Sequence, residues 1–274
     1  MKLGIRIRYD DDFEEAVKTA SKAGFKTVSV CFGASKCFHN SDWEKDLIKI
    51  ENSLRQNNLE CIQTHLPFYS VFSSAEILDK DLDSAMVRCI EATGKLGAEW
   101  AVYHPRTAIN DNCSREKSFK YAVEAITPLV ESAQKYNTGI ALENLPFFPS
   151  HDINLYCSDF EELCKLHDYF NSEKVGICWD FGHAHLMKWE DEAKVIKTVG
   201  DRIKCTHIHN NRQLDDDHNL PSQGSIEWEK IMPAFGEFYK GSLMLEISYK
   251  PNTFLESYFR HAYDCLKYLE NLIK

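Results

Sequence analysis

The stretch Val175-Gly176-Ile177-Cys178-Trp179-Asp180 is a short apolar run that ends on a carboxylate. Comparable short runs, rich in β-branched or apolar residues, recur along the whole chain. Together they occupy residues 3–8, 27–31, 61–65, 100–104, 138–143, 175–180, 203–207 and 242–246. Their length and composition are typical of buried β-strands. The pattern therefore predicts eight strands.

Longer amphipathic stretches separate these runs and carry helix-start signals. Asp11 and Ser41 each precede such a stretch, and Ser158 has Glu161 three residues later, in the pattern of a capping box. Further helices are predicted at 80–96, 115–136, 190–199, 227–238 and 253–273. Strand and helix therefore alternate throughout the chain.

Repeated strand-helix units predict an α/β protein whose parallel strands are covered by helices. Eight such units in about 250 residues are the number at which the sheet closes into a (β/α)8 TIM barrel. No linker rich in Ser, Gly or Pro divides the sequence, so we expect one domain over residues 1–274. A doubly wound open sheet is the alternative.

Composition excludes several classes of protein. The 274 residues include 32 Lys plus Arg and 42 Asp plus Glu, a net charge of −10, with 43% hydrophobic and 27% charged residues. These values are ordinary for a globular protein and exclude a disordered or fibrous chain. The acidic excess argues against a globally basic partner of nucleic acids or anionic membranes.

Targeting and redox signals point to the cytoplasm. No segment approaches the roughly 20 apolar residues of a membrane span, and the first nine residues lack the apolar stretch of a secretory signal. The 10 cysteines are scattered, without a Cys-x-x-Cys pair. We therefore expect reduced, mostly buried thiols.

The C-terminal ends of the last six predicted strands all carry metal-competent side chains. They are His65, His104, Glu143, Asp180, His207 and Glu246. In a barrel, strand ends remote in sequence converge on one mouth, which holds the active site. Three histidines and three carboxylates in one mouth predict a divalent-metal site at the C-terminal face, because unpaired buried carboxylates are costly.

Positions two residues before these ligands test the strand register. They are Gln63, Val102, Ala141, Cys178, Cys205 and Met244. All are uncharged, as expected for the next layer of side chains inside a barrel. The two cysteines among them are therefore predicted to fill the barrel interior.

Loops after the strands offer three more candidate ligands, His183, Asp216 and His218. His209 shares the inward parity of His207 and is predicted to contact a ligand or the substrate. The sequence has no phosphate loop, no dinucleotide-binding glycine pattern and no nucleophile elbow. No nucleotide cofactor is expected.

These residues resemble a known group, the xylose isomerase-like barrel superfamily, which includes endonuclease IV and sugar isomerases and epimerases related to tagatose epimerase. The resemblance rests on Thr64-His65-Leu66-Pro67, Tyr103-His104-Pro105, Leu142-Glu143-Asn144, the stretch from Val175 to His183, His207-Ile208-His209, Asp216-Asp217-His218 and Leu245-Glu246. It extends over essentially the whole chain.

The epimerase and isomerase branch implies one divalent ion, held by Glu143, Asp180, His207 and Glu246. The ion would stabilise an enediolate, while Glu143 and Glu246 act as the catalytic acid/base pair on opposite sides of a sugar or sugar phosphate. Candidate substrate-binding residues are then His65, His104, His183, His209, Arg106 and Arg212. The expected cofactor is Zn²⁺ or Mn²⁺, with one to three ions per chain, and the resemblance also suggests a homodimer.

The endonuclease IV branch implies a different function on the same residues, hydrolysis of a phosphodiester at an abasic site. One zinc ion would take His65 and His104, Glu143 would bridge, and a second ion would take Asp180, His207 and Glu246. A third ion would take His183, Asp216 and His218. Only this alternative makes nucleic acid a partner, and the strand-end loops lack the clustered Lys and Arg that phosphates favour. A related sugar dehydratase and a non-catalytic barrel are further alternatives.

Overall fold

The strands of the computed structural model form one parallel sheet. The structure describes residues 1–33, 38, 42–148, 153–249 and 254–273. All eight predicted strands form: β1 (Lys2–Arg8), β2 (Thr27–Cys31), β3 (Glu60–His65), β4 (Trp100–Tyr103), β5 (Gly139–Glu143), β8 (Val175–Asp180), β9 (Ile203–His207) and β10 (Ser242–Leu245). Their order is β10-β1-β2-β3-β4-β5-β8-β9.

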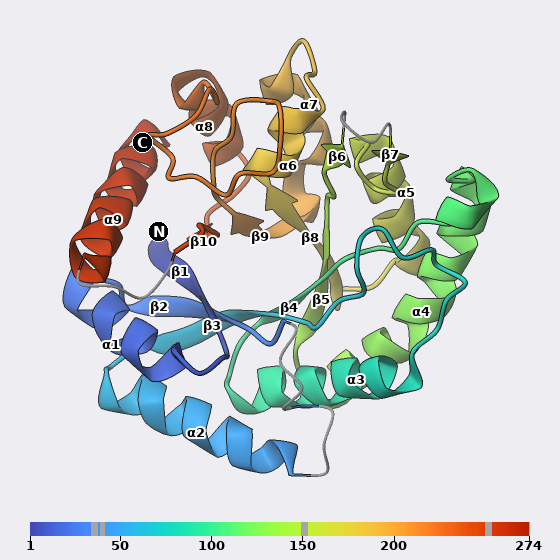
Figure 1. Cartoon of the computed structure of the whole chain (residues 1–274). Coiled ribbons are helices and arrows are strands. Elements are labelled where there is room, and N and C mark those ends of the chain that lie inside the picture. The colour runs from blue at the N-terminus through green and yellow to red at the C-terminus, as the bar shows by residue number, and fades with distance from the viewer. Residues whose placement is uncertain (34–37, 39–41, 149–152, 250–253, 274) are drawn as a thin grey trace.

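A parallel bridge joins the two ends of this order. Ile208 pairs with Leu245, the Ile208 amide donates to Met244 O at 2.8 Å, and the Glu246 amide donates to Ile208 O at 3.0 Å. The sheet therefore closes around a central axis (Figure 1). The predicted TIM barrel is confirmed, and the open doubly wound sheet is wrong.

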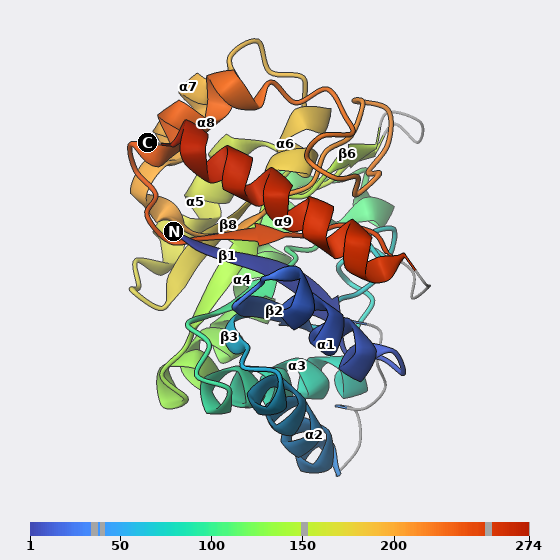
Figure 2. The ribbon, with the colours of Figure 1, turned by 90° about the vertical axis from the view of Figure 1, so that its left-hand side faces the viewer.

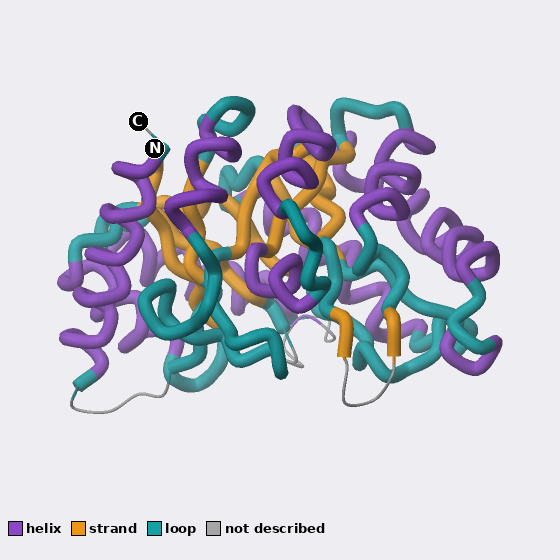
Figure 3. The backbone as a smooth tube through the Cα atoms, turned by 90° about the horizontal axis from the view of Figure 1, so that it is seen from above, coloured by secondary structure: helices purple, strands orange, loops and turns teal. Residues whose placement is uncertain are grey.

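Helices surround the strands in an outer ring (Figures 1 and 3). They are α1 (Phe13–Ala23), α2 (Trp43–Gln56), α3 (Lys80–Lys95), α4 (Arg115–Lys135), α5 (Phe160–Phe170), α6 (Phe181–Leu186), α7 (Glu192–Val199), α8 (Trp228–Gly236) and α9 (Leu255–Leu272). Short 3₁₀ turns lie at Ile109–Asp111 and Gly200–Arg202. The predicted alternation of strand and helix is confirmed.

Local details differ from the sequence-based predictions. Asp159, not Ser158, caps α5 by accepting from the Glu161 amide at 2.7 Å, so the capping-box prediction was one residue too early. The Ser158 hydroxyl instead donates to Leu155 O at 2.7 Å. Asp12 precedes α1 in place of Asp11, and Ser41 lies outside the described residues.

Three short elements were not predicted. Helix α6 follows β8 directly, and β6 (Phe147–Phe148) pairs antiparallel with β7 (Ile153–Asn154). The β6–β7 pair projects from one edge of the barrel (Figure 3). Two-residue strands are too short to show the alternation by which a strand is recognised in sequence.

The barrel interior follows the predicted register. Val102, Ala141, Cys178 and Cys205 form one buried apolar cluster against Trp100. Gln63 and Met244, the other members of that predicted layer, are also buried. The two cysteines therefore fill the interior, as expected, and the cysteines within the described residues are free thiols.

The N-terminus lies close to the end of α9 (Figure 2). The Met1 ammonium pairs with Glu270 Oε1 at 2.6 Å, which links β1 to the end of α9. Among the described residues, no helix has the length and apolar character needed to cross a membrane.

Candidate metal centre and active site

The six strand-end side chains converge at one end of the barrel. His65, Glu143, Asp180, His207 and Glu246 are buried, and the His104 side chain is 14% exposed. Parallel strands bring their C-terminal ends to the same face, which is why residues so far apart in sequence meet here. The predicted meeting of these six residues is therefore observed.

The first group joins β3, β4 and β5. His104 Nε2 lies 2.9 Å from Glu143 Oε2 and 3.1 Å from His65 Nε2. His65 Nε2 is itself 3.3 Å from the same carboxylate oxygen. Two imidazole nitrogens and one carboxylate oxygen thus point at a common volume.

The second group shares Glu143 and adds Asp180, His207 and Glu246. His207 Nδ1 lies 2.9 Å from Glu143 Oε1, 2.6 Å from Glu246 Oε2 and 3.8 Å from Asp180 Oδ2. One ligand atom from each of the four residues lies within 4.8 Å of the other three. Three carboxylates and one imidazole are a donor set suited to a divalent ion.

The third group combines His183, Asp216 and His218. His183 Nε2 and His218 Nε2 lie 3.3 Å and 3.1 Å from Asp216 Oδ2. His183 was predicted on a loop but lies on α6, because the Asp180 carboxylate caps that helix by accepting from the His183 amide at 2.7 Å. His209 stacks on His218, with ring centroids 4.2 Å apart.

Backbone carbonyls orient three of the histidines. Nδ1 of His65, His183 and His218 lies 2.8 Å from the carbonyl oxygen of Leu66, Asn144 and Glu246, respectively. When Nδ1–H donates to that oxygen, the Nε2 lone pair faces the cavity, as metal-binding histidines require. The Asn144 side chain adds two bonds to the Asp180 backbone, at 2.7 and 2.8 Å.

Charge balance in the cluster shifts several pKa values. Burial alone would raise the pKa of Glu143, but His207 and His104 beside it hold that pKa well below its usual value. Burial is likewise outweighed at Glu246, whose pKa is held well down by Arg6 and His207. Burial lowers the pKa of His207, but the carboxylates of Glu143 and Glu246 raise it well above its usual value. The cluster therefore balances its charge with protons when no metal is bound.

Several polar atoms in this cluster have no protein hydrogen-bond partner although they are buried. They include His207 Nε2 and Asp216 Oδ1. Buried polar groups without partners are costly, so such atoms mark places where a ligand or ion belongs. The residues present therefore fit a divalent-metal site.

A cavity of about 210 Å³ opens above these groups. Its walls include Phe68, Val71, Pro146 and Phe148 beside the metal-competent residues. His65, His104 and His183, three of the predicted substrate-binding residues, line it. His209 is buried behind it, with Nε2 at 3.0 Å from Asp180 Oδ1.

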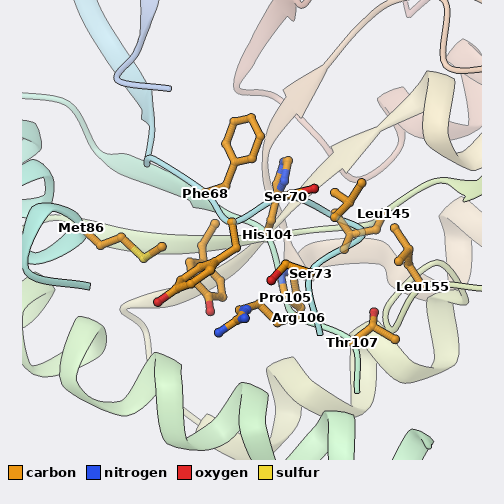
Figure 4. Close-up of a pocket in the computed structure, with 13 residues that line it drawn as sticks. Phe68, Ser70, Ser73, Met86, His104, Pro105, Arg106, Thr107, Leu145 and Leu155 are labelled. Atoms are coloured by element: carbon orange, nitrogen blue, oxygen red, sulfur yellow. The ribbon is translucent and has the colours of Figure 1, made fainter. Parts of the chain in front are cut away.

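The two predicted substrate-binding arginines lie elsewhere. Arg212 is exposed on the loop after β9, outside this cavity. Arg106 is buried beside the loop after β3, and it donates hydrogen bonds to backbone carbonyls (Figure 4). Neither side chain lines the metal-competent cavity.

Arg6 was missed by the sequence analysis and does line the cavity. Its Nη1 lies 2.5 Å from Glu246 Oε1. Leu3, Ile5 and Ile7 on the same strand pack into the hydrophobic core outside the barrel, so the alternating residues point inward. The sequence signal that could have identified Arg6 is its positive charge at an inward-facing position of a barrel strand.

Comparison with known proteins identifies the family to which the chain belongs. A family profile described as "Xylose isomerase-like TIM barrel" matches residues 17–269. The chain belongs to the xylose isomerase-like TIM barrel family. The predicted family is therefore confirmed.

Relatives of this xylose isomerase-like barrel include the uncharacterised protein y4fM of Sinorhizobium fredii, 28% identical over 194 residues, 67% of this chain and 58% of that protein. An inosose isomerase of Bacillus subtilis is 26% identical over 154 residues, 54% of this chain and 53% of that protein. The matches thus span just over half of the length of both relatives. The crystal structure of D-psicose 3-epimerase with D-tagatose from Clostridium cellulolyticum H10 superposes with a TM-score of 0.76 over 100% of both chains, at 16% identity.

Proposed function

We propose that the protein is a divalent-metal-dependent isomerase or epimerase of a sugar or sugar phosphate. The observation that carries the proposal is the set Glu143, Asp180, His207 and Glu246, whose ligand atoms lie within 4.8 Å of one another below a cavity of small-molecule size. The names of an inosose isomerase relative and of epimerases with the same fold agree with it.

The carboxylates of Glu143 and Glu246 carry out the proton transfer in this proposal. Glu143 and Glu246 reach the cavity from β5 and from the end of β10, and each is held ionised by the cations beside it. An ionised carboxylate can remove the proton from a carbon next to a carbonyl, and the carboxylate across the substrate can return one. A divalent ion such as Zn²⁺ or Mn²⁺ would stabilise the negative charge that develops on the substrate oxygens.

The surrounding residues bind and shield the substrate. His183 is oriented by Asn144 and faces the cavity, where it can bond a substrate hydroxyl. Phe68 and Phe148 supply apolar walls that enclose the bound substrate. The cytoplasmic location expected from the sequence is part of the same proposal.

Turnover on a panel of ketoses, ketose phosphates and inososes tests this function. The metal-loaded protein should convert at least one of them, and Glu143→Gln and Glu246→Gln should each lower kcat by roughly a thousandfold or more, because both proton-transfer groups are needed. If only one of the two variants loses activity, the proposed pair is contradicted. The same holds if the unmodified protein converts no sugar of the panel.

The second candidate is an abasic-site phosphodiesterase with three zinc ions. It is favoured by one specific observation, that His65 with His104 and His183 with Asp216 and His218 form two further metal-competent groups beside the first. Against it, Arg6 is the one Lys or Arg among the described residues that line the cavity, and it is already paired with Glu246.

Metal counting together with a nuclease assay separates the two candidates. The isomerase proposal expects one tightly bound ion per chain and no cleavage of a duplex that contains an abasic site. Three zinc ions per chain with efficient cleavage would instead establish the phosphodiesterase. Any metal-dependent turnover excludes a non-catalytic barrel.

A further inference from the structure

Arg106 holds together a connection that has no helix or strand of its own. Residues 66–79, all of which the structure describes, link β3 to α3 without regular secondary structure. Long connections of this kind inside a compact domain are commonly functional, and their shape depends on specific contacts. Arg106 lies beside this connection, two residues beyond His104.

The Arg106 guanidinium makes three contacts with the connection. Nη2 donates to Ser74 O at 2.7 Å and to Ile77 O at 2.6 Å. The guanidinium carbon lies 3.6 Å from the centre of the Tyr69 ring. The guanidinium face lies on the ring while Nη2 donates to both carbonyls from its edge, and a lysine ammonium has no such plane to stack.

We call these three contacts the Arg106 clamp. Tyr69 connects the clamp to the cavity above the candidate metal ligands, because its neighbour Phe68 lines that cavity. The Phe68 ring lies 4.7 Å from the His104 ring and 5.4 Å from the His65 ring, measured between centroids. Phe68 lines the cavity of about 210 Å³, whereas Tyr69 lines a different cavity of about 580 Å³ between α3 and α4. Figure 4 shows Phe68 and Arg106 on opposite sides of this segment. Tyr69 thus contacts Arg106, and the adjacent Phe68 faces the candidate active site.

Other bonds tie the connection down at its end and at its middle. The Tyr69 hydroxyl donates to Asp83 Oδ1 at 2.8 Å and accepts from the Asp79 amide at 2.7 Å. The Ala75 amide donates to Thr107 O at 2.8 Å. None of these bonds reaches Phe68, and the stacking of Arg106 acts on Tyr69, the residue next to it.

We propose that Arg106 is a positioning residue that holds residues 66–79 over the cavity and so places Phe68 as a wall of the substrate site. Arg106 itself does not touch the substrate. The role in substrate binding rests on the proposed function, whereas the clamp itself does not.

Hydrogen exchange followed by mass spectrometry on the full chain tests the clamp. In Arg106→Ala, amide exchange within residues 66–79 should become at least about tenfold faster, while the strands keep their protection. Arg106→Lys should behave like Arg106→Ala, because an ammonium has no plane that can stack on the Tyr69 ring while it reaches both carbonyls. The matched control is Arg202→Ala, which removes an arginine that pairs with Asp168 at 2.7 Å on the surface and should leave residues 66–79 unchanged.

Two outcomes overturn the clamp. One is unchanged exchange in residues 66–79 in Arg106→Ala, and the other is full recovery of protection by Arg106→Lys. If Arg106→Ala exchanges rapidly everywhere, Tyr69→Leu replaces it and is compared with Tyr69→Phe. Both variants lose the hydroxyl bonds to Asp79 and Asp83, and only Tyr69→Leu also loses the ring below the guanidinium. Tyr69→Leu must then show faster exchange than Tyr69→Phe, confined to residues 66–79, and its absence also overturns the clamp.

Kinetics test the consequence for the substrate site. On the sugar that the panel identifies, Arg106→Ala should raise KM by about tenfold or more, with kcat changed by less than about threefold, because Phe68 shapes binding and the proton-transfer groups stay in place. An unchanged KM, or a full rescue by Arg106→Lys, overturns the positioning role. A protein that turns over no sugar contradicts the proposed function and leaves the exchange experiment to decide the clamp.

Discussion

Glu143 and Glu246 can share one buried cluster because His207 stands between them. His207 Nδ1 lies 2.9 Å from one carboxylate and 2.6 Å from the other, and all three side chains are buried. Two carboxylates this close repel each other unless a positive charge lies between them. A proton on His207 supplies that charge without metal, and a divalent ion supplies more of it.

Metal affinity should therefore rise with pH. The neighbouring carboxylates raise the pKa of His207 well above its ordinary value despite burial, so metal must displace a proton to bind. In the metal-free protein, the protonated histidine stabilises the fold at pH below the unfolded pKa of about 6.5, and that contribution is lost as pH rises through the raised folded pKa. Calorimetric Zn²⁺ titrations between about pH 6 and about pH 8 should show tighter binding at the higher pH, with proton release. Affinity that falls with pH would contradict this view.

Gly182 should not tolerate a side chain. A Cβ at this position on α6 would meet the His209 imidazole ring. Gly182→Ala should therefore destabilise the fold by about 1–3 kcal/mol, as overpacking does, measured by urea unfolding. The control is the same substitution in a His209→Ala background, where the ring is gone and the cost should shrink to below about 1 kcal/mol. Equal costs in both backgrounds would show that His209 is not the obstacle.

At the level of elements, Arg115 fastens the segment after β7 to α5. Its Nε bonds Glu162 Oε1 at 2.5 Å, and Nη1 and Nη2 donate to Asn154 O and Leu155 O at 2.8 and 3.0 Å. Glu162 Oε2 also accepts from the Cys157 amide at 3.1 Å. The fork thus fixes the return from the β6–β7 pair to the barrel.

Replacement of this arginine by lysine keeps the charge and removes the fork. Arg115→Lys should cost about 1–3 kcal/mol in free energy of unfolding, because charge-assisted bonds to a half-buried partner are lost. The matched control is Arg202→Lys, which breaks a similar fork to Asp168, where that carboxylate is 51% exposed; it should cost less than about 1 kcal/mol. Comparable losses in the two variants would refute the special role of Arg115.

The strands were predictable from sequence because each is a short apolar run, and the candidate ligands because most of the runs end on a His, Asp or Glu. The run from Val175 to Asp180 is buried throughout and ends on such a carboxylate. Helix α6 escaped prediction because it depends on a hydrogen bond from the His183 amide to Asp180, and the β6–β7 pair escaped because it is short. The contacts of Arg106 and Arg6 depend on how distant segments fold together, which no local pattern contains.

At the level of the whole molecule, we propose one domain over residues 1–274 that metal stabilises. A single barrel should unfold in one cooperative transition. Added Zn²⁺ or Mn²⁺ at a free concentration of about a hundred times its dissociation constant should raise the free energy of unfolding by about 2.7 kcal/mol, and a chelator should reverse it. Differential scanning calorimetry measures both the number of unfolding transitions and the effect of metal on the melting temperature. Two separate transitions would contradict the single domain, and a melting temperature indifferent to metal would contradict the site.

Exchange of a substrate hydrogen with solvent is the sharpest test of the proposed reaction, because it reports the proton transfer itself. The metal-loaded protein in heavy water should incorporate deuterium at a carbon next to the carbonyl of the sugar that it converts, and Glu143→Gln should abolish the incorporation. Conversion of a sugar with no deuterium from solvent, or undiminished incorporation in Glu143→Gln, would contradict proton transfer by the carboxylates of this metal centre.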